Sequence, residues 1–62
     1  MKRSAKTTLG ENGEVLVQFF ENYRMIGTID YSAHSQHYIE DALENWQSGI
    51  LSVETVKAHD IN

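Results

Sequence analysis

The stretch Ser35-Gln-His-Tyr-Ile-Glu-Asp-Ala-Leu-Glu-Asn-Trp-Gln-Ser-Gly49 decides how this chain folds. Apolar residues recur in it and directly after it at intervals of three and four positions, and they are Ile39, Leu43, Trp46 and Ile50, with Tyr38 and Ala42 beside them. This spacing places an apolar stripe along one side of an α-helix. We therefore expect a helix over about residues 35–48, whose apolar side must be covered by the rest of the chain.

Residues with capping chemistry stand at both ends of this helix. A serine such as Ser35 can accept a hydrogen bond from a free backbone amide of the first turn. Gly49 stands where a left-handed residue would end the helix. The opposite side of the helix is polar and mostly acidic, and it carries Gln36, Glu40, Asp41, Glu44, Asn45 and Gln47.

Three β-prone segments precede the helix, at residues 6–9, 14–20 and 23–31. The Asn-Gly pair within residues 10–13 favours a hairpin turn, and residues 21–22 form a second tight connection. We expect Val15, Val17 and Phe19 to face the core. In the last segment the expected core-facing set is Tyr23, Met25, Gly27, Ile29 and Tyr31. The predicted fold is α+β, a small antiparallel three-stranded β-meander packed on the helix of residues 35–48.

The C-terminal segment has two interpretations. Over residues 52–60 it forms either a short helix capped by Ser52 or a fourth strand, and the helix is slightly favoured. The order helix, Gly-Ile-Leu-Ser, helix resembles the first two helices of a helix-turn-helix motif. A second helix that reads DNA should be basic, but the only basic side chain of this segment is Lys57. A corner of two helices that closes the core is the favoured interpretation.

Size and charge limit the class of protein. With 62 residues the chain is long enough for one domain, which we expect over residues 6–62, preceded by a flexible basic tail at residues 1–5. The chain contains no cysteine, so the domain folds without disulfides. No apolar run is long enough for a membrane span, and the expected location is the cytoplasm. From residue 7 onward two basic residues face nine acidic ones. Such an acidic body repels nucleic acid, whereas the tail could still contact it.

Candidate chemistry is sparse. His34, His37 and Asp41 have a spacing that could bring metal ligands together on a helix, but a polar face with a local His37–Asp41 pair is favoured. The carboxylates of Glu40, Asp41 and Glu44 lack the cleft that acid–base catalysis needs. No nucleophile motif or phosphate-binding loop is present. We therefore expect no enzyme, no metal, no cofactor and no small-molecule substrate.

A sheet with helices on one side leaves its far face uncovered. Leu16, Phe20 and Ile26 are expected there, exposed unless the C-terminal segment, a second copy or a partner covers them. Aromatic residues of the strands could instead form a platform for nucleobases, but a core role is favoured. The predicted partner-binding residues are therefore Leu16, Phe20, Ile26 and Arg24, together with the acidic helix residues Glu40, Asp41, Glu44 and Asn45.

The expected function is a non-enzymatic protein-binding or regulatory module that docks on another protein or on a second copy as a homodimer. The alternative is a small nucleic-acid-binding transcriptional regulator that uses Lys2, Arg3, Lys6 and Arg24. The size, the acidic body, the basic start and the sheet-plus-helix layout resemble the small accessory proteins of phages and plasmids. That resemblance implies binding to a host protein and its modulation or inhibition.

Overall fold

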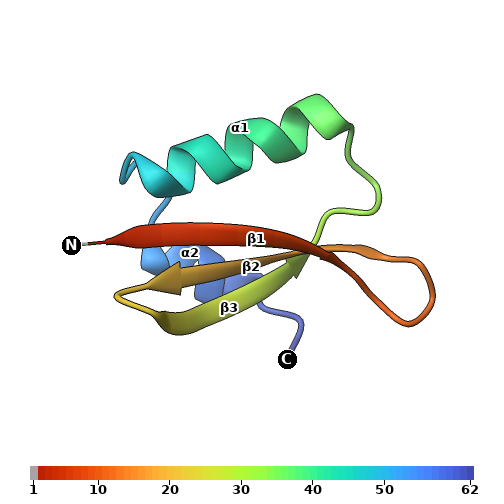
Figure 1. Ribbon diagram of the computed structural model, residues 1–62, viewed down its shortest axis with the longest axis horizontal. Helices are drawn as coiled ribbons and strands as arrows, with labels where there is room; N and C mark the ends of the chain where they lie inside the picture. The colour runs from red at the N-terminus through yellow and green to blue at the C-terminus, as the bar shows by residue number, and fades with distance from the viewer. Residues whose placement is uncertain (1) are drawn as a thin grey trace.

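The computed structural model describes residues 2–62, which form five elements (Figure 1). The strands are β1 (Arg3–Leu9), β2 (Val15–Glu21) and β3 (Arg24–Asp30), and the helices are α1 (Gln36–Gln47) and α2 (Val53–Ala58). The strands form one antiparallel sheet in the order β1-β2-β3. This confirms the predicted α+β meander with its amphipathic helix, and the C-terminal segment is a helix rather than a fourth strand.

Two tight turns connect the strands. In the first, the Gly13 amide donates to the Gly10 carbonyl at 3.1 Å, and Gly13 has a φ of +79°, as the Asn-Gly signal predicts. In the second, Asn22 and Tyr23 have φ values of +52° and +67°. This turn begins one residue later than we expected. Tyr23 therefore belongs to the turn and is 80% exposed, so its predicted place in the core is wrong.

The predicted helix caps are confirmed. Ser35 Oγ accepts the Tyr38 amide at 3.2 Å, and Ser52 Oγ accepts the Thr55 amide at 3.1 Å. Gly49 has a φ of +86°, and its amide donates to the Trp46 carbonyl at 3.2 Å. These bonds satisfy backbone groups that the helix ends would otherwise leave without partners. They also turn the chain directly from α1 into α2.

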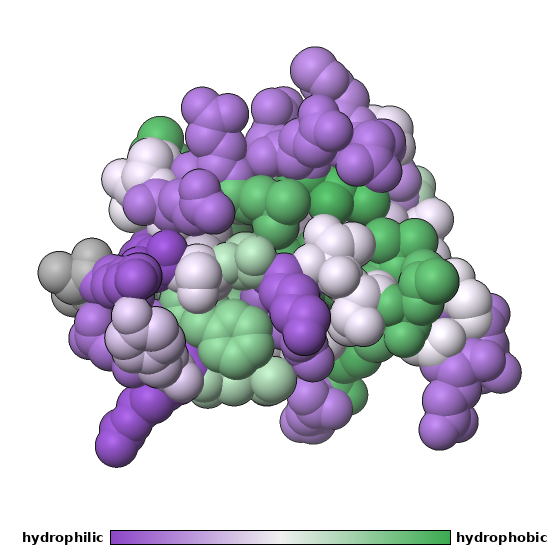
Figure 2. All heavy atoms as spheres, in the orientation of Figure 1, coloured by the Kyte–Doolittle hydropathy of each residue, from purple (hydrophilic) through white to green (hydrophobic). Residues whose placement is uncertain are grey.

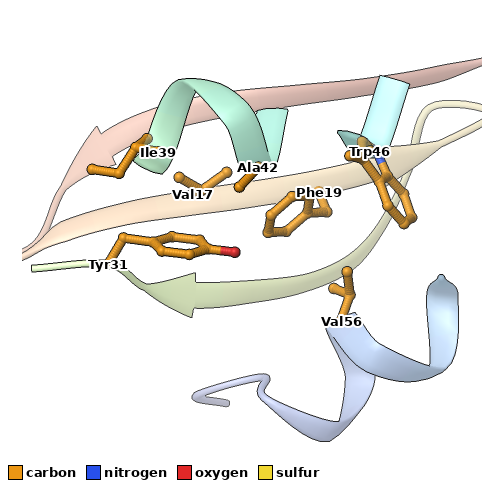
Figure 3. Packing of buried hydrophobic residues seen from close by; sticks show 7 residues of the cluster. All are labelled: Val17, Phe19, Tyr31, Ile39, Ala42, Trp46 and Val56. Atoms are coloured by element: carbon orange, nitrogen blue, oxygen red, sulfur yellow. The ribbon is translucent and has the colours of Figure 1, made fainter. Parts of the chain in front are cut away.

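Both helices pack on the same face of the sheet, with α1 along β1 and α2 against β3 (Figure 1). Trp46 of α1 and Val56 of α2 are both fully buried in one cluster with Phe19 of β2 (Figure 3). Gly27 lies opposite Phe19, and a Cβ atom there would lie 3.1 Å from Val56 Cγ1. The glycine therefore allows α2 to approach β3 closely.

The indole of Trp46 joins the helix to two strands. Its Nε1–H donates to the carbonyl oxygens of Ser4 at 2.9 Å and Phe20 at 3.0 Å, two residues that are paired across β1 and β2. The Phe19 ring meets the indole edge to face, with centroids 5.3 Å apart. Because the polar N–H is satisfied, the large ring can be completely buried without an unpaired donor.

Arg3 covers the other side of this indole. Its guanidinium carbon lies 4.0 Å from the ring centroid, and Nη1 donates to the carbonyls of Leu51 at 2.7 Å and Trp46 at 3.3 Å. Its Nε also pairs with Glu21 at 3.3 Å. We expected residues 1–5 to be a flexible tail, but β1 begins at Arg3, because these contacts hold its first residues. Of that tail, Met1 lies outside the described residues.

A β-bulge in β3 changes which side chains face the core. Phe19 pairs with Gly27 and Phe20 pairs with Met25, so Ile26 is an extra residue between the two pairs. Ile26 packs against the buried cluster, which makes its predicted place on the far face wrong. The extra residue reverses the alternation. Met25, expected in the core, instead lies beside Phe20 and is 48% exposed.

The end of the chain covers the free edge of β3. The Ile61 amide donates to the Thr28 carbonyl at 2.9 Å, and the Thr28 amide donates to Asp60 Oδ1 at 3.2 Å. Thr28 is consequently only 4% exposed although it lies on an outer strand. The C-terminal segment thus pairs the backbone of an edge that would otherwise be open.

Replacing Trp46 by Phe tests the indole contact. The Trp46→Phe variant keeps an aromatic ring but loses the donor shared by two carbonyls, so we expect a loss of about 1–3 kcal/mol in the free energy of unfolding. Urea denaturation measures this loss. Tyr38→Phe is the control, because the exposed Tyr38 should tolerate the change within about 0.5 kcal/mol. Equal losses in the two variants would show that the indole N–H does not hold the sheet to α1.

The attachment of the C-terminal segment should depend on pH. The pKa of Asp60 lies below its ordinary value of 3.8, because the carboxylate accepts the backbone amides of Asn62 and Thr28. A lowered pKa means that ionised Asp60 stabilises the fold above about pH 4 and that this contribution is lost as the pH falls through the folded-state pKa.

Thermal unfolding of the wild type and of Asp60→Asn at a series of pH values measures this contribution. We expect the wild type to be the more stable protein near neutral pH and the difference to shrink toward zero in acid. A difference that stays constant with pH would mean that the charge on Asp60 does not hold the segment.

Candidate docking surfaces

The face of the sheet away from the helices is the broadest candidate surface, and we call it the outer face. The alternation of β1 and β2 and the register of β3 assign to it Ser4, Lys6, Thr8, Leu16, Gln18, Phe20, Met25, Thr28 and Asp30. Leu16 and Phe20 are half-buried, and Met25 is more exposed. Figure 2 shows apolar atoms over the strands with hydrophilic atoms among and around them, whereas the top of the molecule, over α1, is mostly hydrophilic.

One end of the outer face is hollowed. A shallow depression of about 300 Å³ is lined by Ser4, Ala5, Lys6, Phe20 and Tyr23. Lys2 closes this end, because its Nζ donates to the Tyr23 hydroxyl at 2.9 Å and lies 5.1 Å from the centre of the ring. Two aromatic rings and two lysines therefore lie at this end of the outer face.

The four basic residues predicted to contact nucleic acid have different environments. Lys2, Lys6 and Arg24 are exposed. Arg3 is not available for a partner, because its guanidinium is already bound to Glu21, Leu51 and the Trp46 ring. The predicted basic tail is therefore divided between a fold-supporting arginine and two lysines beside the outer face.

The predicted acidic residues Glu40, Asp41, Glu44 and Asn45 are all exposed on α1. They are spread around the surface of the helix. Asp41 and Asn45 border a second depression of about 270 Å³, which also contains Tyr31, Tyr38, Ala42 and Leu51. Glu40 instead accepts a hydrogen bond from Gln36 at 3.4 Å on another side of the helix. This surface is therefore a dispersed acidic helix face rather than a built binding site.

The histidines show no metal geometry. His34 stacks on Tyr38 with ring centroids 4.1 Å apart and meets Tyr31 edge to face at 5.6 Å. Within residues 2–62 no three side chains of the metal-ligating types come together. The pKa of Tyr31 is raised, first by burial and then by the neighbouring Tyr38 hydroxyl, so this phenol stays neutral at physiological pH. The arrangement is an aromatic cluster that closes the start of α1.

One acidic residue on the outer face is held by its own loop. Asp30 accepts hydrogen bonds from the Ser32 hydroxyl and from the Ser32 amide, and these bonds lower the pKa of its carboxyl. The Ser32 hydroxyl in turn accepts the Val15 amide at 2.9 Å. The carboxylate therefore organises the link from β3 to α1.

Met25 and Tyr23 are surface residues that sequence reasoning assigned to the core. Gly27 is a sequence signal for the bulge at Ile26, because a glycine inside a strand often marks a bulge. The turn at Asn22 could have been placed from the tolerance of asparagine for positive φ. Both residues extend the apolar and aromatic part of the outer face beyond the predicted Leu16 and Phe20.

In the described part of the chain, neither helix has the length and apolar composition that crossing a membrane requires. Comparison of the chain with protein-family models, with curated proteins and with solved structures finds no match.

Proposed function

We propose that this chain is a non-enzymatic module that binds another protein through the outer face of its sheet. The observation that carries the proposal is the one-sided packing of the fold. Both helices lie on one face, and within residues 2–62 no element covers Leu16, Phe20 and Met25 on the other.

The composition of the outer face suits a protein partner. Phe20 is on the central strand, with Leu16 on the same strand and Met25 directly opposite Phe20 on β3. Buried aromatic and aliphatic side chains of this kind supply most of the affinity in protein interfaces, and polar side chains around them exclude water. Gln18 and Lys6 supply such polar neighbours. A flat strand face also presents these anchors without a loop that must become ordered on binding.

The acidic face of α1 contributes in a different way. Glu40, Asp41 and Glu44 are exposed and separated from the apolar residues by the thickness of the sheet. Exposed charges change the rate of encounter and the choice of partner more than the final affinity. A partner with a basic surface would be attracted by this side, and its regulation or inhibition would follow from occupation of its surface.

A second candidate function rests on the basic end of the outer face. Lys2 and Lys6 lie beside the rings of Phe20 and Tyr23. Proteins that bind single-stranded nucleic acids combine such basic side chains, which contact phosphates, with aromatic rings on which bases stack. The acidic residues of α1 are on the opposite side of the molecule and would not contact the bound nucleic acid directly. Because this feature is confined to one end, it would accommodate only a short segment.

Substitutions on the outer face test the first proposal. Phe20→Thr and Met25→Thr keep residues that favour β-strands but remove the apolar anchors, and Glu44→Gln is the matched control on α1. Each protein is immobilised, exposed to extract of the source cell and analysed by quantitative mass spectrometry. We expect proteins retained by the wild type and Glu44→Gln to be lost from both outer-face variants, at least tenfold for Phe20→Thr. Retention by all four proteins alike would contradict the proposal, provided circular dichroism shows that they are folded.

A salt titration tests the second candidate. Fluorescence anisotropy with labelled single-stranded DNA and RNA would detect binding that weakens steeply between about 50 and 200 mM salt if phosphates are contacted. Lys6→Gln should then reduce the affinity and the salt dependence together, while Lys57→Gln on α2 should change neither. No binding at low salt would eliminate this candidate and leave protein docking.

A further inference from the structure

Within residues 2–62 one edge of the sheet is covered and the other is open. The edge of β3 is covered where the C-terminal segment binds both backbone groups of Thr28. The edge of β1 has no such cover. Within residues 2–62 no backbone–backbone hydrogen bond joins this strand to anything but β2.

The residues whose backbone points out of this edge can be identified. The Asn22 amide donates to the Lys2 carbonyl at 2.7 Å, and the Gly10 amide donates to the Glu14 carbonyl at 2.8 Å. Hydrogen-bonded pairs alternate along an antiparallel ladder, so the even-numbered residues of β1 bond to β2. The outward backbone groups therefore belong to the odd-numbered residues, which are Arg3, Ala5, Thr7 and Leu9.

We propose that a second copy of this chain pairs with β1 in antiparallel orientation, with the two-fold axis at Thr7, and joins two three-stranded sheets into one continuous sheet. The proposal does not depend on the proposed docking of a partner, because it uses the edge of the sheet rather than its outer face.

Among the registers that place the outward backbone groups opposite one another, those with the axis at Ala5, Lys6 or Thr7 have the longest overlap. An axis at Lys6 would give the longest overlap, but it sets Lys6 directly against Lys6 of the second copy, and like charges in that position are destabilising. An axis at Ala5 uses only the first part of the strand and leaves Leu9 beyond it. An axis at Thr7 sets threonine against threonine, which is a favourable pair, and Lys6 against the uncharged Thr8 of the second copy.

The exposed apolar residue on β1 also favours the axis at Thr7. Leu9, at the end of β1, is 73% exposed although it is on the helix-covered side of the sheet. In this register Leu9 lies opposite Ala5 of the second copy on the helix-covered side. The register therefore covers the largest apolar side chain that the edge leaves in water.

The flank of α1 above this edge carries little charge. Tyr38, Asp41 and Asn45 border the depression shared with Tyr31 and Leu51, so they lie on the side of α1 toward β3 and α2. At 100° per residue the opposite flank, above β1, carries Gln36, Leu43, Gln47 and Glu40. Only one of these is charged, so charge does not oppose the approach of two antiparallel α1 helices across the axis.

Of the features by which edge strands avoid such pairing, β1 has a lysine but neither a proline nor a bulge. The chain contains no proline, and the register between β1 and β2 runs without a bulge from Arg3 to Leu9. Lys6 is the one charged side chain in the middle of the strand. Lys6 disfavours the register with its axis at Lys6 and permits the register with its axis at Thr7.

Sedimentation velocity over a range of concentrations up to millimolar tests the pairing. We expect the wild type to shift from monomer to twice the monomer mass, and Thr7→Pro to remain monomeric. Proline is tolerated where the amide points away from the ladder, so Thr7→Pro should fold but lose the central outward donor. Thr7→Val keeps this donor and should dimerise as the wild type does, with both folds checked by circular dichroism.

A wild type that stays monomeric at millimolar concentration would overturn the proposal. So would a dimer that survives in Thr7→Pro, or one that is lost in Phe20→Thr but kept in Thr7→Pro, because those results place the contact on the outer face.

Disulfide trapping tests the register, since the chain contains no cysteine of its own. An axis at Thr7 places the two Cα atoms of residue 7 about 5.5 Å apart, within the range of a disulfide, and those of residue 4 roughly 20 Å apart. Thr7→Cys should therefore form a cross-linked dimer under mild oxidation much faster than Ser4→Cys. Equal rates, or faster cross-linking of Ser4→Cys, would overturn this register.

Discussion

The contact between Arg3 and Trp46 is the constraint on which the rest of the structure depends. One indole binds the backbone of β1 and β2 through its N–H, packs its ring on Phe19 and is covered by the guanidinium of Arg3. The same guanidinium reaches the Leu51 carbonyl between the helices. Two side chains thereby join three elements and the α1–α2 link, in a chain too short for a large core and without a disulfide.

This arrangement makes the molecule one-sided. Because the indole draws α1 onto the sheet and Gly27 admits α2 beside it, both helices occupy the same face. The C-terminal segment then closes the edge of β3 at Thr28. The outer face and the edge of β1 have no such cover within residues 2–62, and the proposed partner contact and the proposed self-pairing use these two surfaces.

Features encoded by neighbouring residues could be predicted from the sequence. The spacing of Ile39, Leu43 and Trp46 determines the helix, Ser35 and Ser52 cap the two helices, and Gly49 separates them. Each of these signals depends on side chains within a turn or two of one another, and a single sequence contains all the information they need.

Features that depend on distant residues could not be predicted in this way. Arg3 resembles part of a solvated basic tail until the structure shows Trp46 beneath it, 43 positions later in the chain. The bulge at Ile26 depends on how β3 fits both β2 and α2, so strict alternation wrongly exchanged Met25 and Ile26. The candidate surface was accordingly predicted in part: Leu16 and Phe20 are on it, whereas Ile26 belongs to the core and Met25 takes its place.

Amide hydrogen exchange, measured residue by residue by NMR on dilute protein, tests most directly whether the fold leaves these surfaces open. We expect slow exchange for Ser4, Lys6 and Thr8, whose amides bond to β2, and for Thr28, whose amide binds Asp60. We expect fast exchange for Ala5 and Thr7, whose amides point out of the sheet. Protection of Ala5 and Thr7 equal to that of Lys6 in the dilute monomer would contradict this expectation.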